Sequence, residues 1–359
     1  MKRIGILNSG GDCAGLNAVI SSFTKYAQSE GYEIFGFIKG FEGVLDKKYM
    51  ELTQEKVRGI SHLGGTILQS TNKGRFGAKV GEGNIARIPQ EILQQTKQNL
   101  ADLGIDKLCV IGGDGTLSSA YQLQEYGISV VGVPKTMDND LASTDKTFGF
   151  STAVDIVTDA IDKINTTMTS HNRVFFIETF GRHTGWVALF SGLAGGVDMI
   201  LLPEVKFSYE KIVNYLKKRK ESGREHAIIV VAEGAKSEDG KLVIRKRTES
   251  SEVTLGGISQ LLMEEIDTRA PGEFELRNTI LGHVQRGGSP NTEDRILAKR
   301  LGVAAFDAIK MGKFGHMVSL RGNEIVFVPI LDAVDKLKTV PVNDPLVEVA
   351  RKVGISFGD

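Results

Sequence analysis

Short apolar runs alternate with amphipathic stretches along most of the chain. Residues 3–8, 107–113 and 128–133 form apolar runs with little polar alternation, which is typical of parallel strands that are covered on both faces. Residues 14–31 and 116–127 follow two of these runs and have helical spacing of their apolar positions. This alternation predicts an α/β protein with a largely parallel sheet.

Further elements follow from the same pattern. Apolar runs predict strands at residues 33–38, 174–179, 199–204 and 227–234, and amphipathic stretches predict helices at 150–173, 185–196, 258–266 and 294–310. Within residues 141–170 the pattern changes to a long polar helix, after which a new series of strands and helices begins. A chain of 359 residues is long enough for about two domains, and we place a boundary there.

Composition limits the partners of the protein. Lysine plus arginine and aspartate plus glutamate both count 44, so neither the net charge nor any basic run favours nucleic acid or an acidic membrane. The apolar segments are too short for a signal peptide or a membrane span. Cys13 and Cys109 lack metal-ligand spacing, which favours buried free thiols in a reducing compartment. We expect a soluble cytoplasmic protein.

Glycine is the compositional exception, because 42 glycines make up about 12% of the chain against a usual share of about 7%. Many fall in pairs at the ends of apolar runs, where they allow tight turns whose amides approach a ligand. The first such stretch, LNSGGDCAG at residues 7–15, joins a predicted strand to its helix. An ordinary turn is the alternative there, since neither P-loop nor GxGxxG spacing is present.

The second stretch, VIGGDGT at residues 110–116, places an acid inside a glycine turn. A lone carboxylate would repel a phosphate at the same helix end, but Asp114 can hold Mg²⁺, which bridges phosphate oxygens. Thr116 is the expected N-cap of the following helix. The alternative is that Asp114 is only a helix cap.

The third stretch, PKTMDND at residues 134–140, puts one cation and two acids at the end of an apolar run. Because neighbouring strands lie about 5 Å apart, Thr136, Asp138 and Asp140 should lie close to Asp114. Converging carboxylates repel one another unless a metal and cations share the site, and one of them can then act as a base. An Asx-rich turn is the alternative.

Basic side chains gather in LRNTILGHVQRGGSP at residues 276–290. Arg277, His283 and Arg286 surround a short strand and a double-glycine turn, an arrangement that suits a phosphate dianion. Each arginine taken alone could instead be a surface ion-pair partner. The histidines of the chain lack zinc-binding spacing.

Six motifs, in this order, closely resemble those of the 6-phosphofructokinases: NSGGDCAGLNA, IGGDGT, PKTMDND, ETFGRHTG, VAEG and LGHVQRGGSP. The likeness runs from the first strand to about residue 312. It implies a glycolytic phosphotransferase with two Rossmann-like three-layer domains. The phosphoryl-donor domain would comprise residues 1–142 and about 262–312, and the fructose 6-phosphate domain residues 143–261 and about 313–359 with the C-terminal tail.

The resemblance implies roles for residues around the donor. Asp138 looks like the general base that takes the proton from the sugar 1-hydroxyl, with Thr136 and Asp140 orienting the site. Asp114 looks like the acid associated with Mg²⁺. The amide of Gly11 would meet the transferred phosphoryl group, and Arg182 would offset its charge. The other donor-binding residues would be Gly112, Gly113, Gly115, Thr116 and Lys135.

The resemblance also implies a sugar-phosphate site and an oligomer. The substrate-binding residues would be Thr136, Asp138, Phe180, Gly181, Arg182, Glu233, His283 and Arg286. Arg173 and Arg277 match two arginines that, in this family, reach the 6-phosphate from a neighbouring subunit. A homodimer or homotetramer is therefore implied.

Two positions give conflicting indications of the donor. Gly115 leaves room for the α-phosphate of ATP where pyrophosphate users of the family carry Asp, whereas Lys135 matches the lysine of pyrophosphate users. We favour ATP, because steric access is a requirement while an additional ammonium can coexist with ATP. Pyrophosphate stays the alternative donor. Another GGDGT kinase and a sugar-phosphate-binding subunit without turnover are remoter alternatives.

Further positions depart from the family pattern. Asn72 stands where the family has an arginine that contacts transferring phosphates, and Lys73 or Arg75 could replace it. Ser21 and Lys25 stand where allosteric bacterial members carry two effector-binding arginines. Control by ADP or phosphoenolpyruvate is therefore not assumed.

Overall fold

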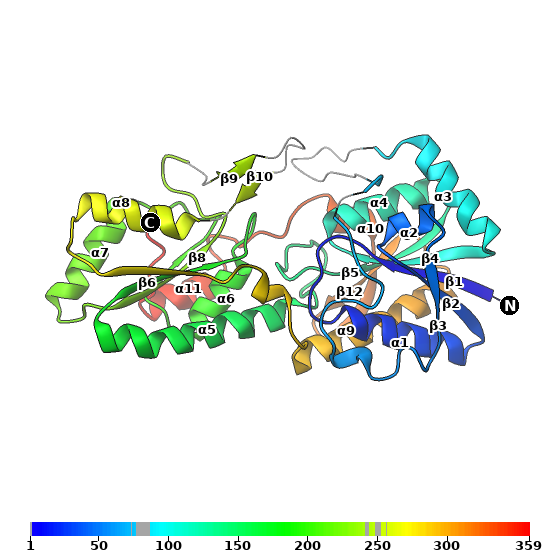
Figure 1. Ribbon diagram of the computed structural model, residues 1–359, viewed down its shortest axis with the longest axis horizontal. Coiled ribbons are helices and arrows are strands. Elements are labelled where there is room, and N and C mark those ends of the chain that lie inside the picture. The colour runs from blue at the N-terminus through cyan, green and yellow to red at the C-terminus, as the bar shows by residue number, and fades with distance from the viewer. Residues whose placement is uncertain (1, 73, 77–86, 241–243, 248–252, 256) are drawn as a thin grey trace. The chain divides into compact units, whose positions relative to one another are not determined.

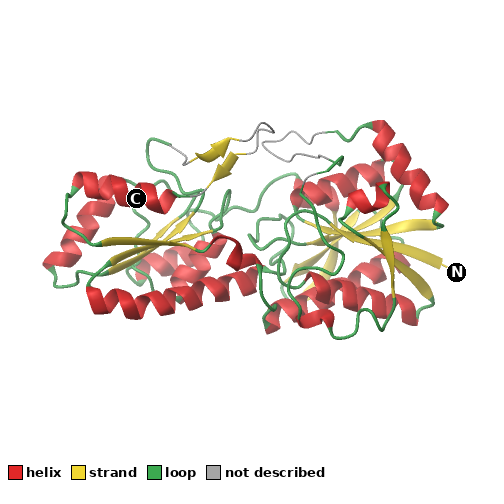
Figure 2. Ribbon diagram, viewed as in Figure 1, coloured by secondary structure: helices red, strands yellow, loops and turns green. Residues whose placement is uncertain are grey.

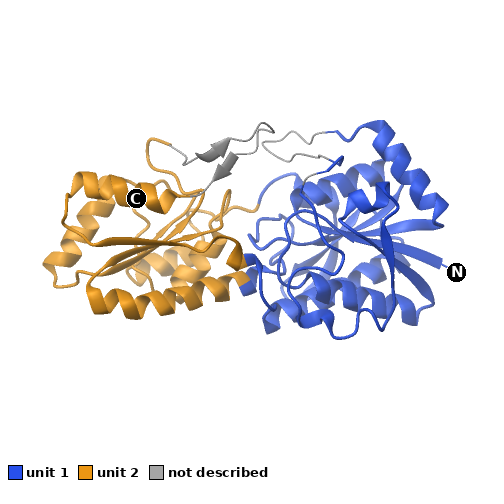
Figure 3. Ribbon diagram, viewed as in Figure 1, with its two compact units in different colours: residues 1–152, 286–337 blue, residues 153–285, 338–359 orange. Residues whose placement is uncertain are grey.

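The computed structural model describes the chain except for residues 1, 73, 77–86, 241–243, 248–252 and 256. The chain forms two compact units (Figure 3). Unit 1 comprises Met1–Thr152 and Arg286–Leu337, and unit 2 comprises Ala153–Gln285 and Lys338–Asp359. Each unit is a mostly parallel sheet with helices on both faces (Figure 2), which confirms the predicted α/β class.

Unit 1 is built on a sheet in which the described strands have the order β13-β12-β5-β4-β1-β2-β3. They are β1 (Lys2–Asn8), β2 (Tyr32–Phe37), β3 (Tyr49–Leu52), β4 (Ile105–Gly112), β5 (Ser129–Pro134), β12 (His316–Arg321) and β13 (Glu324–Pro329). The outer strands β3 and β13 run antiparallel to their neighbours, and the other pairs are parallel. A largely parallel sheet of this kind is covered on both faces.

The helices of unit 1 form a layer on each face of the sheet. One layer contains α1 (Leu16–Ser29) and α9 (Thr292–Lys310), which pack against each other (Figure 1). The other layer contains α2 (Phe41–Leu45), α3 (Gln90–Asp102), α4 (Asp114–Glu125) and α10 (Ile330–Val334). The short 3-10 helix η1 (Ile60–His62) packs beside α1.

The strand order of unit 1 reverses beside β1. The chain passes from β1 to β2 on one side, and β4 then pairs with β1 on the other side. In doubly wound sheets, ligands bind outside the carboxyl ends of the strands at such a reversal. The glycine turns after β1 and β4 both lie at this place.

Unit 2 contains a parallel sheet whose described strands have the order β11-β6-β8-β7. They are β6 (Val174–Thr179), β7 (Met199–Leu201), β8 (Ala227–Ala232) and β11 (Leu276–Ile280). The helices are α5 (Phe150–His171), α6 (Trp186–Ala194), α7 (Tyr209–Glu221), α8 (Ile258–Arg269) and α11 (Pro345–Lys352), with α7 beside α8 and α11 beside α6. A hairpin is formed by β9 (Ile244–Arg247) and β10 (Val253–Leu255).

The bounds of the units differ from those of the predicted domains. The second segment of unit 1 comprises residues 286–337. The predicted second segment of the donor domain was about 262–312. The reason is that β12 pairs with β5 and β13 pairs with β12, which adds both strands to the sheet of unit 1. Helix α8 packs on β11 and β6 and so belongs to unit 2.

Burial of the strands explains why they appear in the sequence as nearly continuous apolar runs. Every residue of β8 is buried, and Ile4, Ile6 and Leu7 of β1 are fully buried. None of the helices in the described part of the chain has both the length and the apolar character that a membrane span requires. Cys13 and Cys109 are buried free thiols, as predicted.

Candidate active site in unit 1 and a ligand group in unit 2

Three turns meet at the carboxyl ends of β1, β4 and β5 in unit 1. Strand β4 pairs with both β1 and β5. Beyond the strand ends, the amide of Ser9 donates to the carbonyl of Ile111 (3.1 Å), and the amide of Lys135 donates to the carbonyl of Gly112 (2.9 Å). The three stretches that the sequence singled out therefore lie at one edge of the sheet.

The turn after β1 depends on its glycines. Gly10 has a φ of 81°, in the left-handed region that glycine adopts without strain. Its carbonyl accepts a hydrogen bond from the hydroxyl of Ser70. A Cβ on Gly11 would lie only 2.9 Å from Nη1 of Arg286, so a larger residue at Gly11 would displace that guanidinium.

The turn after β4 leads directly into α4. A Cβ on Gly112 would lie 2.2 Å from Cβ of Thr116, so this position accepts only glycine. Gly113 is the N-cap of α4 and no side chain caps the helix, so the predicted capping role of Thr116 is wrong. The helix begins at Asp114, and Thr116 is buried in its first turn. The first amides of α4 lack intrahelical partners and can face an anion.

The turn after β5 is tied to the first turn by a buried lysine. Lys135 is 5% exposed, and its ammonium donates to the carbonyl of Gly11. Asp138 and Asp140 follow it and are partly buried. The amide of Asp138 donates to the hydroxyl oxygen of Thr136 (3.1 Å).

The electrostatic environment couples the three carboxylates Asp114, Asp138 and Asp140, here called the acidic cluster. Burial and the charges of Asp138 and Asp114 raise the pKa of Asp140 from 3.8 to about 7. Burial also raises the pKa of Asp138, against the opposing effects of Arg286 and Lys135. Closely spaced carboxylates cannot all ionise easily without counter-charge.

The two cations beside the acidic cluster differ in character. Burial lowers the pKa of Lys135, and the charge of Arg286 acts in the same direction. Asp114 and Asp140 oppose this shift. Arginine keeps its charge under all such conditions. Arg286 is therefore the permanent positive charge facing Asp138.

The donor set of the acidic cluster fits a magnesium ion. Carboxylate oxygens are the hard ligands that Mg²⁺ prefers, and a divalent cation would relieve the repulsion that raises the pKa of Asp140. Within the described residues, no group of three or more Asp, Glu, His or Cys side chains could hold a metal ion. Mg²⁺ usually takes one or two carboxylates and completes its shell with phosphate oxygens and water.

A second group of predicted residues lies at the carboxyl edge of the sheet in unit 2. It consists of residues that directly follow β6, β8 and β11: Phe180, Gly181, Arg182, Glu233 and His283, here called the unit 2 group. Phe180 and His283 form an edge-to-face contact with ring centres 5.6 Å apart. Arg182 and His283 are exposed, and Glu233 is half-buried.

Backbone contacts hold the unit 2 group in place. The amide of Glu233 donates to the carbonyl of Thr179 (2.9 Å), and the amide of Gly234 donates to the carbonyl of Gly181 (3.1 Å). A Cβ on Gly234 would lie 2.1 Å from the carbonyl oxygen of Arg182, so the close approach of these two loops needs glycine. Glu233 and Arg182 are thereby kept beside each other.

Arg173 and Arg277 lie at the opposite edge of the same sheet. They stand at the amino-terminal ends of β6 and β11, and both bind Oε1 of Glu275, at 2.6 Å and 2.7 Å. A strand rises about 3.3 Å per residue, so the carboxyl end of the strand is roughly 20 Å from Arg173 along β6 and roughly 10 Å from Arg277 along β11. The two arginines and the unit 2 group therefore lie at opposite ends of these strands.

Other predicted residues are placed as follows. Arg75 binds Glu42 and Asp46 on the surface, at 2.8 Å and 2.5 Å, and Asn72 is exposed. Lys73 lies outside the described residues. Arg286, which was assigned to the sugar phosphate with His283, is brought against Gly11 in unit 1.

Positions 21 and 25 of α1 differ in their surroundings. The hydroxyl of Ser21 donates to the carbonyl of Val57 (2.9 Å) and is buried, whereas Lys25 is exposed. Ser21 therefore has a structural partner inside unit 1.

Two buried asparagines, Asn8 and Asn17, hold the loop beside the first turn, a role that the sequence did not predict for them. Asn8 accepts a hydrogen bond from the hydroxyl of Thr66 (2.7 Å), and Asn17 accepts one from the amide of Ile67 (2.9 Å). Each side-chain amide also donates to backbone carbonyls of the same loop. The available signal was a polar residue at a buried position of each element, since buried polar groups need partners.

The raised pKa of Asp140 leads to a prediction about stability. Between about pH 4 and pH 7 the unfolded chain loses a proton that folded Asp140 keeps, so ionisation lowers the free energy of unfolding as the pH rises. Asp140→Asn should therefore raise the melting temperature more at pH 8 than at pH 4. The exposed residue Asp335 gives the matched control, Asp335→Asn. Equal effects of the Asp140 substitution at both pH values would contradict the pKa assignment.

A family model and full-length relatives place the chain in the same family. A family model described as phosphofructokinase matches residues 3–309. The ATP-dependent 6-phosphofructokinase 2 of Clostridium perfringens is 44% identical and is aligned over 100% of this chain and 99% of its own length. A pyrophosphate–fructose 6-phosphate 1-phosphotransferase of Streptomyces coelicolor is 45% identical over 99% of this chain and 100% of its own.

A solved structure shows the same fold. The phosphofructokinase of Pichia pastoris in its T-state matches with a TM-score of 0.79 and 28% identity over 98% of this chain. This chain spans 36% of the length of that larger yeast chain. Together with the family model and the full-length relatives, this likeness leads to one conclusion: the chain belongs to the phosphofructokinase family.

Proposed function

We propose that the protein transfers a phosphoryl group from Mg-ATP to the 1-hydroxyl of fructose 6-phosphate, giving fructose 1,6-bisphosphate and ADP. The observation that carries this proposal is the acidic cluster, which lies with Lys135 and Arg286 at the glycine turns of a strand reversal. Such a place combines anion-binding amides, a metal-binding acid and a base.

Backbone amides are the main ligands of the donor phosphates in this proposal. Gly11, in the turn after β1, would contact the transferred group, and Gly112, Gly113, Gly115 and Thr116 form the turn and first helical residues after β4. The N-terminal end of α4 carries a partial positive charge that favours phosphate. Asp114 would hold Mg²⁺, which neutralises phosphate charge when it is bound.

Asp138 is the proposed general base. Burial raises the pKa of Asp138, and a carboxylate with a raised pKa is a stronger base than an exposed aspartate once it is ionised. The charges of Arg286 and Lys135 oppose that rise and so favour the ionised form that accepts a proton. Thr136 and Asp140 would orient the hydroxyl that loses it.

The unit 2 group is proposed to bind the sugar phosphate. Glu233 can accept hydrogen bonds from sugar hydroxyls, and His283 can donate to phosphate oxygens. Arg182 is exposed at the same strand edge and would offset the charge on the transferring group. Phe180, in contact with His283, and Gly181 would shape the wall of this position.

Arg173 and Arg277 are proposed to complete the site of a neighbouring copy of the chain. Their position at the amino-terminal ends of β6 and β11, opposite to the strand ends that His283 follows, argues against a shared phosphate within one chain. Both bind Glu275, which directly precedes the edge strand β11, where a second chain can approach. The proposal therefore includes a homo-oligomer of at least two chains.

Pyrophosphate is the second candidate donor, and a specific observation favours it. The buried Lys135 donates to the carbonyl of Gly11, where it adds positive charge beside the transferred phosphate. Relatives named for ATP and for pyrophosphate are also equally similar to this chain, at 44% and 45% identity. Gly115 supports ATP, because it leaves space for the α-phosphate.

Replacing the proposed base tests the proposed reaction. Asp138→Asn should lower kcat by about 10³-fold or more with a small change in the KM for fructose 6-phosphate, because proton removal belongs to the transition state. The measurement is a coupled assay of fructose 1,6-bisphosphate formation. Asp106→Asn, at an exposed position, serves as the control. An unchanged kcat in Asp138→Asn would remove Asp138 as the base.

A second substitution separates the two donors. Lys135→Gly should keep ATP-dependent turnover and reduce any pyrophosphate-dependent turnover, because ATP brings further phosphates to the turn after β4. Lys135→Met, which keeps most of the side-chain volume, controls for the cavity that glycine leaves in this buried position. Complete loss of ATP turnover in both variants would show that Lys135 is essential for the ATP reaction.

A mixing experiment tests the sharing of sites between chains. Arg277→Ala alone should raise the KM for fructose 6-phosphate by about tenfold or more, whereas Arg351→Ala, which also removes an ion pair of unit 2, should not. When Arg277→Ala and Asp138→Ala chains are unfolded and refolded together, half of the dimers are mixed, and each has one intact site. Activity at low sugar phosphate should then recover to about a quarter of the native value. No recovery would mean that each chain holds a complete site.

A further inference from the structure

We propose that Thr147 is a positioning residue for the catalytic turn, defined as residues 135–140. It lies in a backing segment, defined as residues 147–152, which packs behind that turn. This inference rests on the proposed function, because the turn carries the proposed base Asp138. Nothing in the sequence patterns singles out Thr147.

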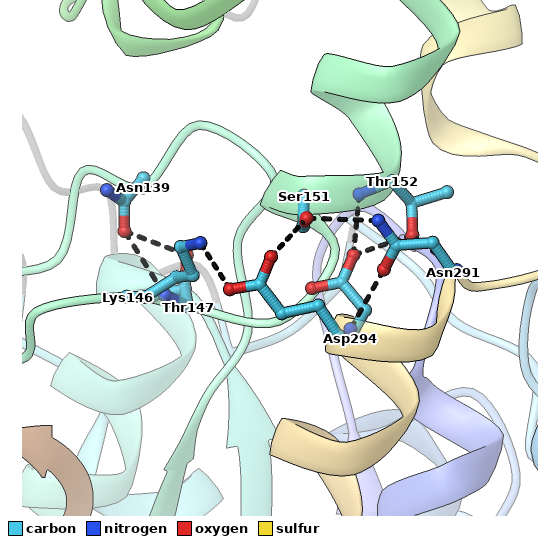
Figure 4. Close-up of polar contacts among 8 residues, drawn as sticks. Asn139, Lys146, Thr147, Ser151, Thr152, Asn291 and Asp294 are labelled. Carbon is cyan, nitrogen blue, oxygen red and sulfur yellow. Dashed lines mark hydrogen bonds and ion pairs between the residues drawn. The ribbon is translucent and has the colours of Figure 1, made fainter. Parts of the chain in front are cut away.

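Thr147 donates hydrogen bonds to two residues of the catalytic turn. Its hydroxyl donates to the carbonyl of Thr136 (2.6 Å), and its amide donates to Oδ1 of Asn139 (3.1 Å). Figure 4 shows the side chain of Asn139 directed toward Thr147. The two bonds therefore fix the chain immediately before Met137 and immediately after Asp138.

The conformation of the turn explains why such support is needed. Asn139 has a φ of 52°, in the left-handed region, which few residues other than glycine adopt and asparagine adopts more often than most. It is 4% exposed and stands between Asp138 and Asp140. Backbone conformations of this kind persist only where the surroundings fix them. The bond from Thr147 to the Asn139 side chain supplies part of that fixation.

The backing segment is itself held from the side of the first turn. Phe148 forms an isolated parallel bridge with Lys135, and its carbonyl accepts a hydrogen bond from the thiol of Cys13 (3.5 Å). Gly149 lies so close to this thiol that an added Cβ would be 2.5 Å from Sγ. Phe148 is fully buried. The segment therefore cannot shift toward the turn after β1.

The far end of the backing segment is anchored to α9. The amide and the hydroxyl of Thr152 both donate to Oδ2 of the buried Asp294, at 2.7 Å and 2.6 Å (Figure 4). The hydroxyl of Thr152 in turn accepts from the amide of Asn291 (2.9 Å). Asn291 caps α9 by accepting from the amide of Asp294 (2.9 Å).

More exposed contacts lie beside the buried hydrogen bonds of Thr152 and Asp294. Lys146 binds one oxygen of Glu293, and the hydroxyl of Ser151 donates to the other (2.7 Å). These residues are more exposed than Thr152 and Asp294. The surface contacts are weak supports because exposed ion pairs are screened by water. The buried contacts of Thr147 and Thr152 are thus the rigid part of the support.

The support bears on the reaction because proton transfer depends on position. Removing the Thr147 hydroxyl leaves the partly buried carbonyl of Thr136 without this donor, and one of the two contacts that hold the turn is lost. A displacement of about 1 Å at a reacting group can cost about 10²-fold in rate. The sugar ligands of the unit 2 group are on other elements and keep their contacts. The expected loss is therefore in kcat and not in the KM for fructose 6-phosphate.

The test compares two matched threonines. Thr147→Val keeps the shape and removes the hydroxyl, and Thr147→Ser keeps the hydroxyl. Thr96→Val is the control, since Thr96 is also fully buried and its hydroxyl donates to a backbone carbonyl, that of Ile92 (2.7 Å), within α3. Thr147→Val should lower kcat by about 10- to 100-fold with KM within about twofold. Thr147→Ser should restore most of kcat, and Thr96→Val should lower the melting temperature without lowering kcat.

Asn139→Gly provides an independent variant should Thr147→Val not fold. Glycine accepts the positive φ, while the acceptor of the Thr147 amide is lost, so kcat should fall in the same way. A kcat of Thr147→Val or Asn139→Gly equal to that of Thr96→Val would overturn the inference, as would a change confined to KM. A native chain without any phosphoryl transfer to fructose 6-phosphate would instead refute the proposed function.

Discussion

The electrostatic constraint on the unit 1 site is that the carboxylates of Asp114, Asp138 and Asp140 act on one another at a partly buried sheet edge. Burial opposes the ionisation of Asp138 and Asp140, and the neighbouring carboxylates add to this effect, so that the pKa of Asp140 rises to about 7. Lys135 and Arg286 oppose the rise at Asp138, while burial lowers the pKa of Lys135 itself. A place with this balance of charges is stabilised by a bound cation or by proton uptake.

The glycine turns and the buried supports follow from that constraint. Gly112 cannot carry a side chain because Thr116 fills the space, and Gly11 leaves room for Arg286. The carbonyl of Gly11 also accepts from Lys135, so the turns after β1 and β5 are joined by a cation. Behind them, Thr147 and Asp294 fix the backbone that carries Asp138. The backbone that carries the acidic cluster is thus held mostly by close packing at glycines and by hydrogen bonds of uncharged groups.

Much of the fold and of the unit 1 site could be predicted from the sequence, for physical reasons. Strands such as β4 and β8 are buried on both faces, so they read as continuous apolar runs. The carboxyl ends of neighbouring parallel strands must meet, which allowed Asp114 and the catalytic turn to be placed together. Strand β13 contains the apolar run IVFVP, but the family motifs end near residue 312. This run and β12 were therefore not assigned to a sheet, and the return of the chain to unit 1 was misplaced.

Contacts between side chains and backbone could not be predicted from the pattern. Thr147 is an ordinary threonine in a polar stretch, and only the fold brings it to Thr136 and Asn139. The position of Arg286 beside Gly11, three residues from His283 in the chain, likewise depends on where the chain turns back into unit 1. Thr116 was expected to cap a helix that begins two residues earlier.

The most direct test of the central claim is to follow the phosphoryl group itself. The native protein is incubated with fructose 6-phosphate, Mg²⁺ and either ATP or pyrophosphate, and ³¹P NMR identifies the product. We expect a new phosphate ester on the 1-hydroxyl of the sugar with ATP as donor, and no ester when Mg²⁺ is removed by a chelator. Absence of this ester with both donors would show that the protein is not a phosphofructokinase in its activity.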